Sequence, residues 1–257
     1  MAHTSHILRP AFTRILGKEL FQGAVYNLVG KEKDGTSRLL DDLLGMELPD
    51  LRMVVVDMRE FSRHITDFLS GVSQAMGFEE VPQAFGEWID ALQIHGGKCC
   101  LILNHFDAIE TGKETGYDHA FFAALNRFHL IPALSLVIVT SNPWEVRLTR
   151  LEDFLSQGEF EPNILKLPPL GFKRYQEELQ RKFPKWKPDL DIIAEIYSHP
   201  LAYLFFEDVL SRLEAAGKTK PDVDVATIKQ WRTYFDEEKG IATSQASDKE
   251  SPWWKFW

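Results

Sequence analysis

The sequence has 257 residues, of which 44% are hydrophobic and 26% charged, and its formal net charge is −9. This length and composition are typical of a globular protein with a sizeable core and exclude a disordered or fibrous chain. Nucleic-acid binding through the phosphate backbone needs clustered Lys and Arg residues, so the negative charge argues against a large nucleic-acid interface. There is no signal-peptide pattern and no apolar run long enough to span a bilayer, so we expect a cytoplasmic protein without a transmembrane segment.

Five short apolar runs, rich in β-branched residues, alternate with helix-like segments. The runs are continuous, which is typical of strands covered on both faces of a parallel sheet. The predicted strands span residues 24–30, 52–58, 99–106, 134–141 and 163–170. The predicted helices span residues 37–45, 60–77, 83–96 and 118–130. This alternation predicts an α/β fold with a parallel sheet flanked by helices.

Beyond about residue 171 the strand signals stop. The predicted helices there span residues 172–183, 189–198, 200–217 and 225–238. We therefore expect an α/β core over residues 1–170, a helical subdomain over 171–240, and a flexible linker with an aromatic C-terminal peptide over 241–257. One basic patch surrounds Trp186, but a single short patch in so acidic a chain is no strong nucleic-acid signal.

The two cysteines, Cys99 and Cys100, are adjacent within a predicted strand. Neighbouring residues of a strand point to opposite faces, so neither a disulfide nor a shared metal is expected. We predict two buried free thiols in a reducing compartment. The histidines are scattered without the spacing of metal ligands, and no metal site is predicted.

The turn after the first predicted strand reads GKEKDGTS, residues 30–37, and leads directly into a helix. Two glycines five residues apart, with a strand before and a helix after, are the layout of a phosphate-binding P-loop. Gly30, Gly35 and the final hydroxyl of Ser37 match this layout. The lysine that would contact the β- and γ-phosphates is replaced by Thr36. Lys31 and Lys33 lie within the loop, but either would need an unusual path to take its place. Two other interpretations remain open: an empty turn that the fold retains, and a Ser37 that only caps the helix.

Polar residues follow the third and fourth predicted strands. A hydrolytic P-loop protein carries an acid for Mg²⁺ at the end of the third strand, often with a glutamate that activates water. Here these positions hold Asn104 and His105, and Asp107 follows. Thr140 and Ser141 end the fourth strand, where such folds place a γ-phosphate sensor. We expect His105 to be a hydrogen-bonded structural residue, because no partner for a base is evident.

Five segments in this order resemble the STAND branch of the AAA+-like P-loop ATPases: NLVGKEKDGTSRLLDDL, CCLILNHFD, LSLVIVTS, ILKLPPLGFKRYQEEL and SHPLAYL. The resemblance covers roughly residues 20–215. It implies that the helical subdomain is a lid and that His199 and Pro200 form its motif near the nucleotide base. The candidate nucleotide-binding residues are then Gly30, Gly35, Thr36, Ser37, Asn104, Asp107, Thr140, Ser141, His199 and Pro200.

The departures from this family pattern predict a degenerate ATPase. The lysine, the metal-binding acid and the catalytic base are all replaced, and each such group commonly contributes orders of magnitude in rate. We therefore assign no catalytic residue. The cofactor is either absent or is ATP or ADP held without fast hydrolysis.

The segment PWWKFW at residues 252–257 follows a polar stretch. Tryptophan is enriched in binding hot spots, because it buries a large rigid surface. Trp253, Trp254, Phe256 and Trp257 are therefore candidate partner-binding residues. The segment has three possible sites: its own domain, another protein, or a membrane interface.

These features favour a non-catalytic, STAND-like adaptor or regulatory subunit that docks a protein partner through the aromatic segment. The resemblance implies a prokaryotic signalling or antiviral defence system. One alternative is a nucleotide-gated switch that binds ATP or ADP with little hydrolysis. A second is an AAA+-like regulator of DNA transposition.

Overall fold

The computed structural model describes residues 7–30, 34–46, 48–143, 160–215 and 223–241. The chain divides after Leu170 into two compact units, Met1–Leu170 and Gly171–Trp257, and each is described by itself. Among the described residues, no helix is both long and apolar enough to cross a membrane.

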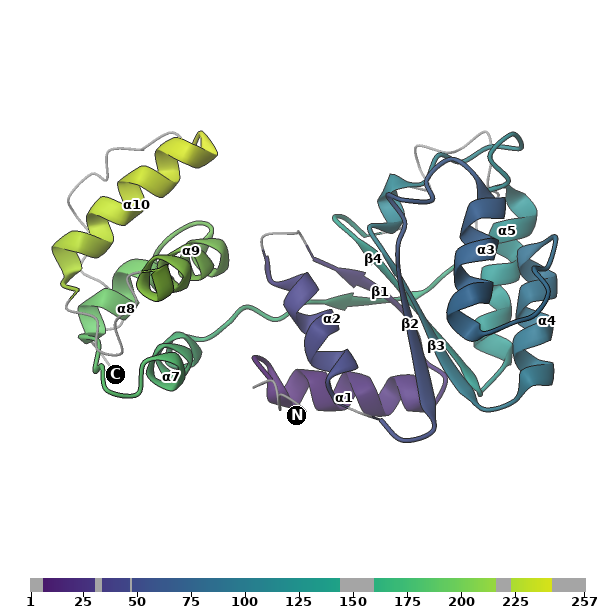
Figure 1. Ribbon diagram of the computed structural model, residues 1–257, viewed down its shortest axis with the longest axis horizontal. Helices are drawn as coiled ribbons and strands as arrows, with labels where there is room; N and C mark the ends of the chain where they lie inside the picture. Colours follow the sequence, from purple (N-terminus) through teal and green to yellow (C-terminus); the bar gives the residue numbers. More distant parts are fainter. Residues whose placement is uncertain (1–6, 31–33, 47, 144–159, 216–222, 242–257) are drawn as a thin grey trace. The chain divides into compact units, whose positions relative to one another are not determined.

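The first unit contains a five-stranded parallel sheet (Figure 1). Its strands are β1 (Val25–Val29), β2 (Leu51–Asp57), β3 (Lys98–Asn104), β4 (Leu134–Thr140) and β5 (Asn163–Lys166). They lie in the order β2-β3-β4-β1-β5. The central strands β3 and β4 are buried almost throughout, as their continuous apolar sequences require. The predicted fold class is confirmed.

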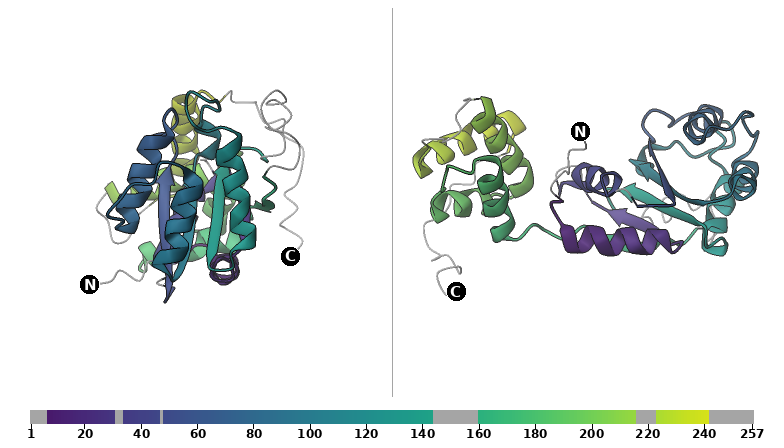
Figure 2. Two further views of the ribbon diagram at one scale, coloured as in Figure 1. Left: turned by 90° about the vertical axis from the view of Figure 1, so that its right-hand side faces the viewer. Right: turned by 60° about the horizontal axis from the view of Figure 1, so that its bottom comes forward.

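Helices cover both faces of the sheet (Figures 1 and 2). On one face lie α3 (Ile65–Met76), α4 (Phe85–His95) and α5 (His119–Asn126); on the other lie α1 (Pro10–Phe21) and α2 (Thr36–Leu44). The first face has an aromatic core in which Phe68, Phe85 and Phe121 are in mutual ring contact. The second is aliphatic, and Leu16 and Leu39 pack there with the sheet residues.

The strand register brings the polar strand ends together at one edge of the sheet. Val29 of β1 pairs with Thr140 of β4, and Asp57 of β2 pairs with Asn104 of β3. All strands are parallel, so their carboxyl ends share this edge. In open α/β sheets this is the edge at which ligands bind.

Three elements differ from the sequence-based expectation. Helix α1 was not predicted; it begins with a proline at its first turn, and Gly17 lies at its centre, facing Met46 and Leu48. Helix α3 begins at Ile65 rather than at residue 60, because the preceding residues form turns after β2. Strand β5 ends at Lys166, since Pro168 and Pro169 have no amide hydrogen to continue the ladder.

The cysteines point to opposite faces, as predicted. Cys99 belongs to the aromatic core and Cys100 to the aliphatic core, and both are buried free thiols. Burial raises the pKa of the Cys99 thiol to about 11 and raises that of Cys100 as well. Thiolate, the reactive form, is therefore scarce at neutral pH.

We expect neither thiol to react with iodoacetamide in the native protein at pH 8, and both to react in urea. The alkylated mass of the intact chain measures this directly. Rapid alkylation of one thiol in the native protein would contradict the placement of the two side chains.

The second unit contains α7 (Phe172–Lys182), α8 (Leu190–Tyr197), α9 (Ala202–Ala215) and α10 (Val225–Lys239). Tyr175 lies edge-on against Phe206 at the centre of its core. Trp186, in the basic patch, is only 5% exposed and packs edge-on against Phe183. Its ring is therefore not available as a platform on which a nucleotide base would stack.

Candidate functional site

A small cavity lies at the carboxyl edge of the sheet, beside the start of α2. Its volume is about 90 Å³. The residues that line it are Gly30, Thr36, Ser37, Asn104, His105, Asp107, Val139, Thr140 and Ser141. The fold thus brings together most of the predicted nucleotide-binding residues, which come from the ends of β1, β3 and β4 and from the first turn of α2.

Thr36 lies inside the turn rather than projecting from it. A Cβ atom on Gly30 would collide with the Thr36 hydroxyl oxygen, and Thr36 is only 4% exposed. Gly35 precedes the helix as its N-cap residue with a φ of +84°, a conformation that favours glycine. Both glycines are therefore required by the turn itself. Ser37 is the second residue of α2 and not its N-cap, so the interpretation of Ser37 as the cap was wrong.

A buried chain of hydrogen bonds holds the end of β4. The side-chain amide of Asn27 donates to Thr140 Oγ1 over 2.7 Å, and the Thr140 hydroxyl donates to the Asn142 carbonyl over 2.6 Å. Asn27 is completely buried in β1. Asn27 was not among the predicted site residues, although a polar residue within the apolar run VYNLV is a visible signal.

Asp107 connects the segment after β3 to the segment after β4. Its Oδ2 atom accepts hydrogen bonds from the Ser141 backbone amide at 3.0 Å and from the Ser141 hydroxyl at 2.7 Å. One oxygen of the only carboxylate among the lining residues is therefore already occupied.

His105 has an unusual conformation and an unusual environment. Its φ is +54°, in the left-handed region that few non-glycine residues adopt. Its buried Nδ1 atom makes no hydrogen bond to any described residue, and the Asp57 Oδ1 atom lies 3.9 Å away. The prediction of a hydrogen-bonded structural histidine was therefore wrong for this nitrogen atom.

Asp57 is engaged by Arg59 instead. The Arg59 Nε and Nη2 atoms donate to the two carboxylate oxygens at 3.0 and 2.6 Å. These hydrogen bonds hold the pKa of Asp57 below its usual value. The paired guanidinium keeps Asp57 ionised, so at neutral pH an anion faces the His105 ring.

The charge of the lining residues is poorly suited to a triphosphate. They contribute one carboxylate and one imidazole, and no Lys or Arg is among them. Pockets for nucleotide-sized ligands typically have volumes of about 300–1,000 Å³. As the described residues define it, the cavity has room for a group such as a single phosphate.

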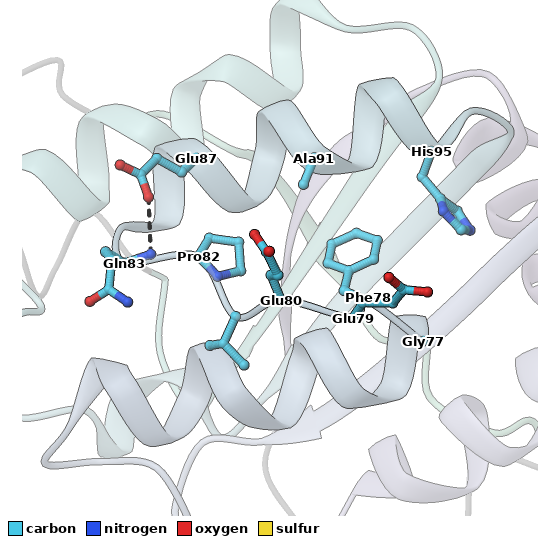
Figure 3. Close-up of a pocket in the computed structure, with 10 residues that line it drawn as sticks. Gly77, Phe78, Glu79, Glu80, Pro82, Gln83, Glu87, Ala91 and His95 are labelled. Carbon is cyan, nitrogen blue, oxygen red and sulfur yellow. Dashed lines mark hydrogen bonds between the residues drawn. The ribbon is translucent and has the colours of Figure 1, made fainter.

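A larger hollow of about 700 Å³ lies between α4 and the segment that joins α3 to it (Figure 3). Phe78 and Pro82 lie along it, and the carboxylates of Glu79, Glu80 and Glu87 line it. Three carboxylates repel phosphate, so the hollow is less suited to a nucleotide than the cavity at the strand ends. This hollow was not predicted from the sequence.

His199 lies in the core of the helical unit. Its side chain is 0% exposed, and Nε2 lies 2.8 Å from Asp236 Oδ1. The Leu201 amide donates to Nδ1 at 2.9 Å. Both nitrogen atoms of the imidazole are thus engaged inside the helical unit. Pro200 is exposed.

The strand order β2-β3-β4-β1-β5, the glycine-bounded turn between β1 and α2, and the polar strand ends define an AAA+-like P-loop fold. The sequence matches no protein family and no curated protein. Similar solved structures support the fold.

One similar structure is the Walker-type ATPase PABY2304 of Pyrococcus abyssi, with a TM-score of 0.60, 15% identity, and coverage of 93% of this chain and 74% of that one. A second is the ADP form of the Aeropyrum pernix ORC2 protein, with a TM-score of 0.58, 14% identity, and coverage of 87% and 66%. A third is domain III of the Thermotoga maritima replication initiation protein DnaA, with a TM-score of 0.55, 15% identity, and coverage of 88% and 91%.

These likenesses concern the fold alone, because all three identities are low. This chain spans 66% of the length of the ORC2 chain. The predicted AAA+-like fold is therefore established, and the predicted STAND type is taken up below as a proposal.

Proposed function

We propose that this protein is a non-catalytic, AAA+-like module that acts by assembling with a protein partner. The observation that carries this proposal is the position of Thr36. At the place where a P-loop lysine would contact phosphate, a neutral side chain lies buried beneath the turn. Asn104, also neutral, occupies the position of the metal-binding acid.

These replacements act together on ATP turnover. Phosphoryl transfer depends on positively charged groups that stabilise the charge developing on the phosphates. Removing one such electrostatic group commonly slows catalysis about 100- to 1,000-fold. With the lysine and the acid both replaced, hydrolysis falls to a rate without biological use.

A phosphate-release assay at millimolar ATP with Mg²⁺ tests the loss of catalysis. We expect no release above that of a protein-free control. An Asn104→Ala variant separates true activity from contamination. If the wild type released phosphate and the Asn104→Ala variant released less, the activity would belong to this site and would contradict the proposal.

The aromatic residues Trp253, Trp254, Phe256 and Trp257 lie outside the described residues. We propose them as the docking peptide for the partner, because aromatic residues, tryptophan above all, are enriched at protein interfaces and in their hot spots. The finer assignment, a STAND-type module in a prokaryotic defence or signalling system, rests on the order of the five sequence motifs alone.

The assembly is tested with the protein encoded beside this one as the candidate partner. We expect its affinity to fall sharply when residues 241–257 are removed. The matched variant is the full-length chain with alanine at the four aromatic positions. Its affinity for the partner should fall as much as that of the truncated chain. Equal affinity of the intact and the truncated chain would count against the docking peptide.

A nucleotide-gated switch is the second candidate, and the environment of His105 favours it. An unpaired, buried nitrogen beside a cavity with several hydroxyl and amide groups is suited to a bound polar ligand. Calorimetric titration with ATP or ADP and Mg²⁺ tests this function. No heat at millimolar nucleotide would exclude it.

The third candidate, an AAA+-like regulator of DNA transposition, has less support. The chain is acidic, and Trp186 of its basic patch is buried. A salt-dependent gel-shift assay would detect the binding of DNA.

A further inference from the structure

One buried arginine contacts two separate segments. The first directly precedes α2, and the second lies near the end of the first unit. Arg9 is only 8% exposed. Its Nη2 atom donates to the backbone carbonyl of Asp34 at 2.9 Å, and its Nε atom donates to the backbone carbonyl of Pro168 at 2.9 Å. These two acceptors are far apart in the sequence, and a single guanidinium group contacts both.

The two segments have distinct roles in the fold. Asp34 is the last residue before Gly35, the N-cap of α2, and so belongs to the glycine-bounded turn. Pro168 lies beyond the end of β5, in the stretch that leads to Leu170, where the first unit ends. Because Pro168 and Pro169 have no amide hydrogen, this stretch cannot be held by backbone donors at those positions.

The backbone of Arg9 is itself firmly held. Arg9 is the N-cap residue of α1, and its carbonyl oxygen accepts hydrogen bonds from the amide and the hydroxyl of Thr13 at 2.8 and 2.9 Å. The preceding amide, that of Leu8, donates to Asp42 Oδ2 at 2.8 Å. Asp42 lies on α2, is 1% exposed, and also accepts a hydrogen bond from Arg38. Arg9 therefore projects from an anchored base.

The chemistry of arginine makes this contact rigid. The guanidinium group is planar and always charged, and its donors have fixed directions. Two carbonyl oxygens bound to one such group cannot move independently without breaking a charge-assisted hydrogen bond. A displacement of Asp34 is therefore transmitted to Pro168.

We propose that Arg9 is a positioning residue that couples the glycine-bounded turn to the stretch leading into the helical unit. Movement of the turn is transmitted to Pro168, in the stretch that follows β5. If a phosphate-bearing ligand enters the turn, which rests on the nucleotide-gated function above, its arrival reaches residues 167–171 through this side chain. This role belongs to a residue of the N-terminal segment and not to any P-loop motif.

Hydrogen–deuterium exchange of the full chain tests the coupling without any ligand. In Arg9→Gln we expect amide exchange to rise by about tenfold or more, as loss of charged hydrogen bonds implies. The rise is expected in both segments: at Leu39, whose amide donates to the Gly35 carbonyl at the start of α2, and at Leu167, whose amide donates to the Val29 carbonyl beside Pro168. Arg14→Gln is the matched control, because Arg14 is an exposed arginine of α1, and it should leave both segments unchanged. A rise in one segment only, or in neither, would overturn the proposal.

A milder variant protects the test against loss of folding. Arg9→Lys keeps the charge and loses the fixed pair of donors, so a smaller rise in both segments is expected. Wild-type exchange in both segments of this variant would also overturn the proposal.

Millimolar inorganic phosphate and ADP, added separately, provide the second arm. In the wild type we expect altered exchange in both segments, and in Arg9→Gln an alteration confined to the turn. If exchange in the wild type changed only in the turn, the proposed coupling would be overturned. No alteration in either protein would count against the nucleotide-gated function, whereas the ligand-free comparison alone decides the role of Arg9.

Discussion

Replacing Thr36 with lysine is expected to raise the affinity for ATP with Mg²⁺ by about 10- to 150-fold. A hydrogen bond to a charged group contributes about 1.5–3 kcal/mol, and every 1.4 kcal/mol corresponds to about a factor of ten in the dissociation constant. The fold already supplies the rest of the phosphate site: a left-handed Gly35, the amino end of α2, and Ser37 beside the cavity. Among the described residues that line the cavity, no cation is present.

The lysine must leave the position that Thr36 occupies. The threonine hydroxyl lies against Gly30, where a longer side chain has no room, so the lysine stem turns outward over the turn. This rearrangement loses the small buried contact and carries the ammonium group toward the phosphate position. The expected gain in binding free energy is therefore that of the charged hydrogen bond, reduced by a modest cost in packing.

Calorimetric titration of the wild type, Thr36→Lys and Thr36→Val measures the effect. Valine has nearly the shape of threonine and carries no charge, so it separates the lost hydroxyl from the added cation. We expect Thr36→Val to bind no better than the wild type. Equal affinity of the valine and lysine variants would show that the missing charge is not what limits binding at this site.

The sequence was sufficient to predict the sheet and its polar edge, because both depend on local pattern. Continuous apolar runs mark buried parallel strands, and the residues that follow them meet at one edge whatever the details of packing. Asn104, Asp107, Thr140 and Ser141 were found in this way, and they line one cavity.

Contacts between distant residues were beyond the reach of that reasoning. The bond from Arg9 to Pro168 spans 159 positions, and no local pattern indicates it. Helix α1 was not predicted because its sequence pattern is weak and the helix depends on packing against α2 and the sheet. The contact between His199 and Asp236 was not predicted for the same reason, since the two residues are 37 positions apart.

This buried pair leads to the second large effect: His199→Ala should destabilise the helical unit by about 3–5 kcal/mol, because it leaves the buried Asp236 carboxylate without this hydrogen bond and opens a cavity in the core. Nδ1 accepts a hydrogen bond from Leu201, so Nε2 carries the proton that is donated to Asp236. The ring also packs against Phe205 and Phe235, with centroids 5.0 and 5.3 Å away. Alanine removes both hydrogen bonds and leaves a cavity between α8, α9 and α10.

Amide exchange of the full chain in increasing urea measures this effect for each unit separately. We expect protection to fall in α8, α9 and α10 and to stay unchanged in β3. Lys229→Ala, an exposed substitution on α10, is the matched control and should change little. Asp236→Asn retains an oxygen acceptor for Nε2, so protection against exchange should fall clearly less in this variant than in His199→Ala. Undiminished protection of the helical unit in His199→Ala would contradict a structural role for this histidine and restore the case for its placement at a ligand.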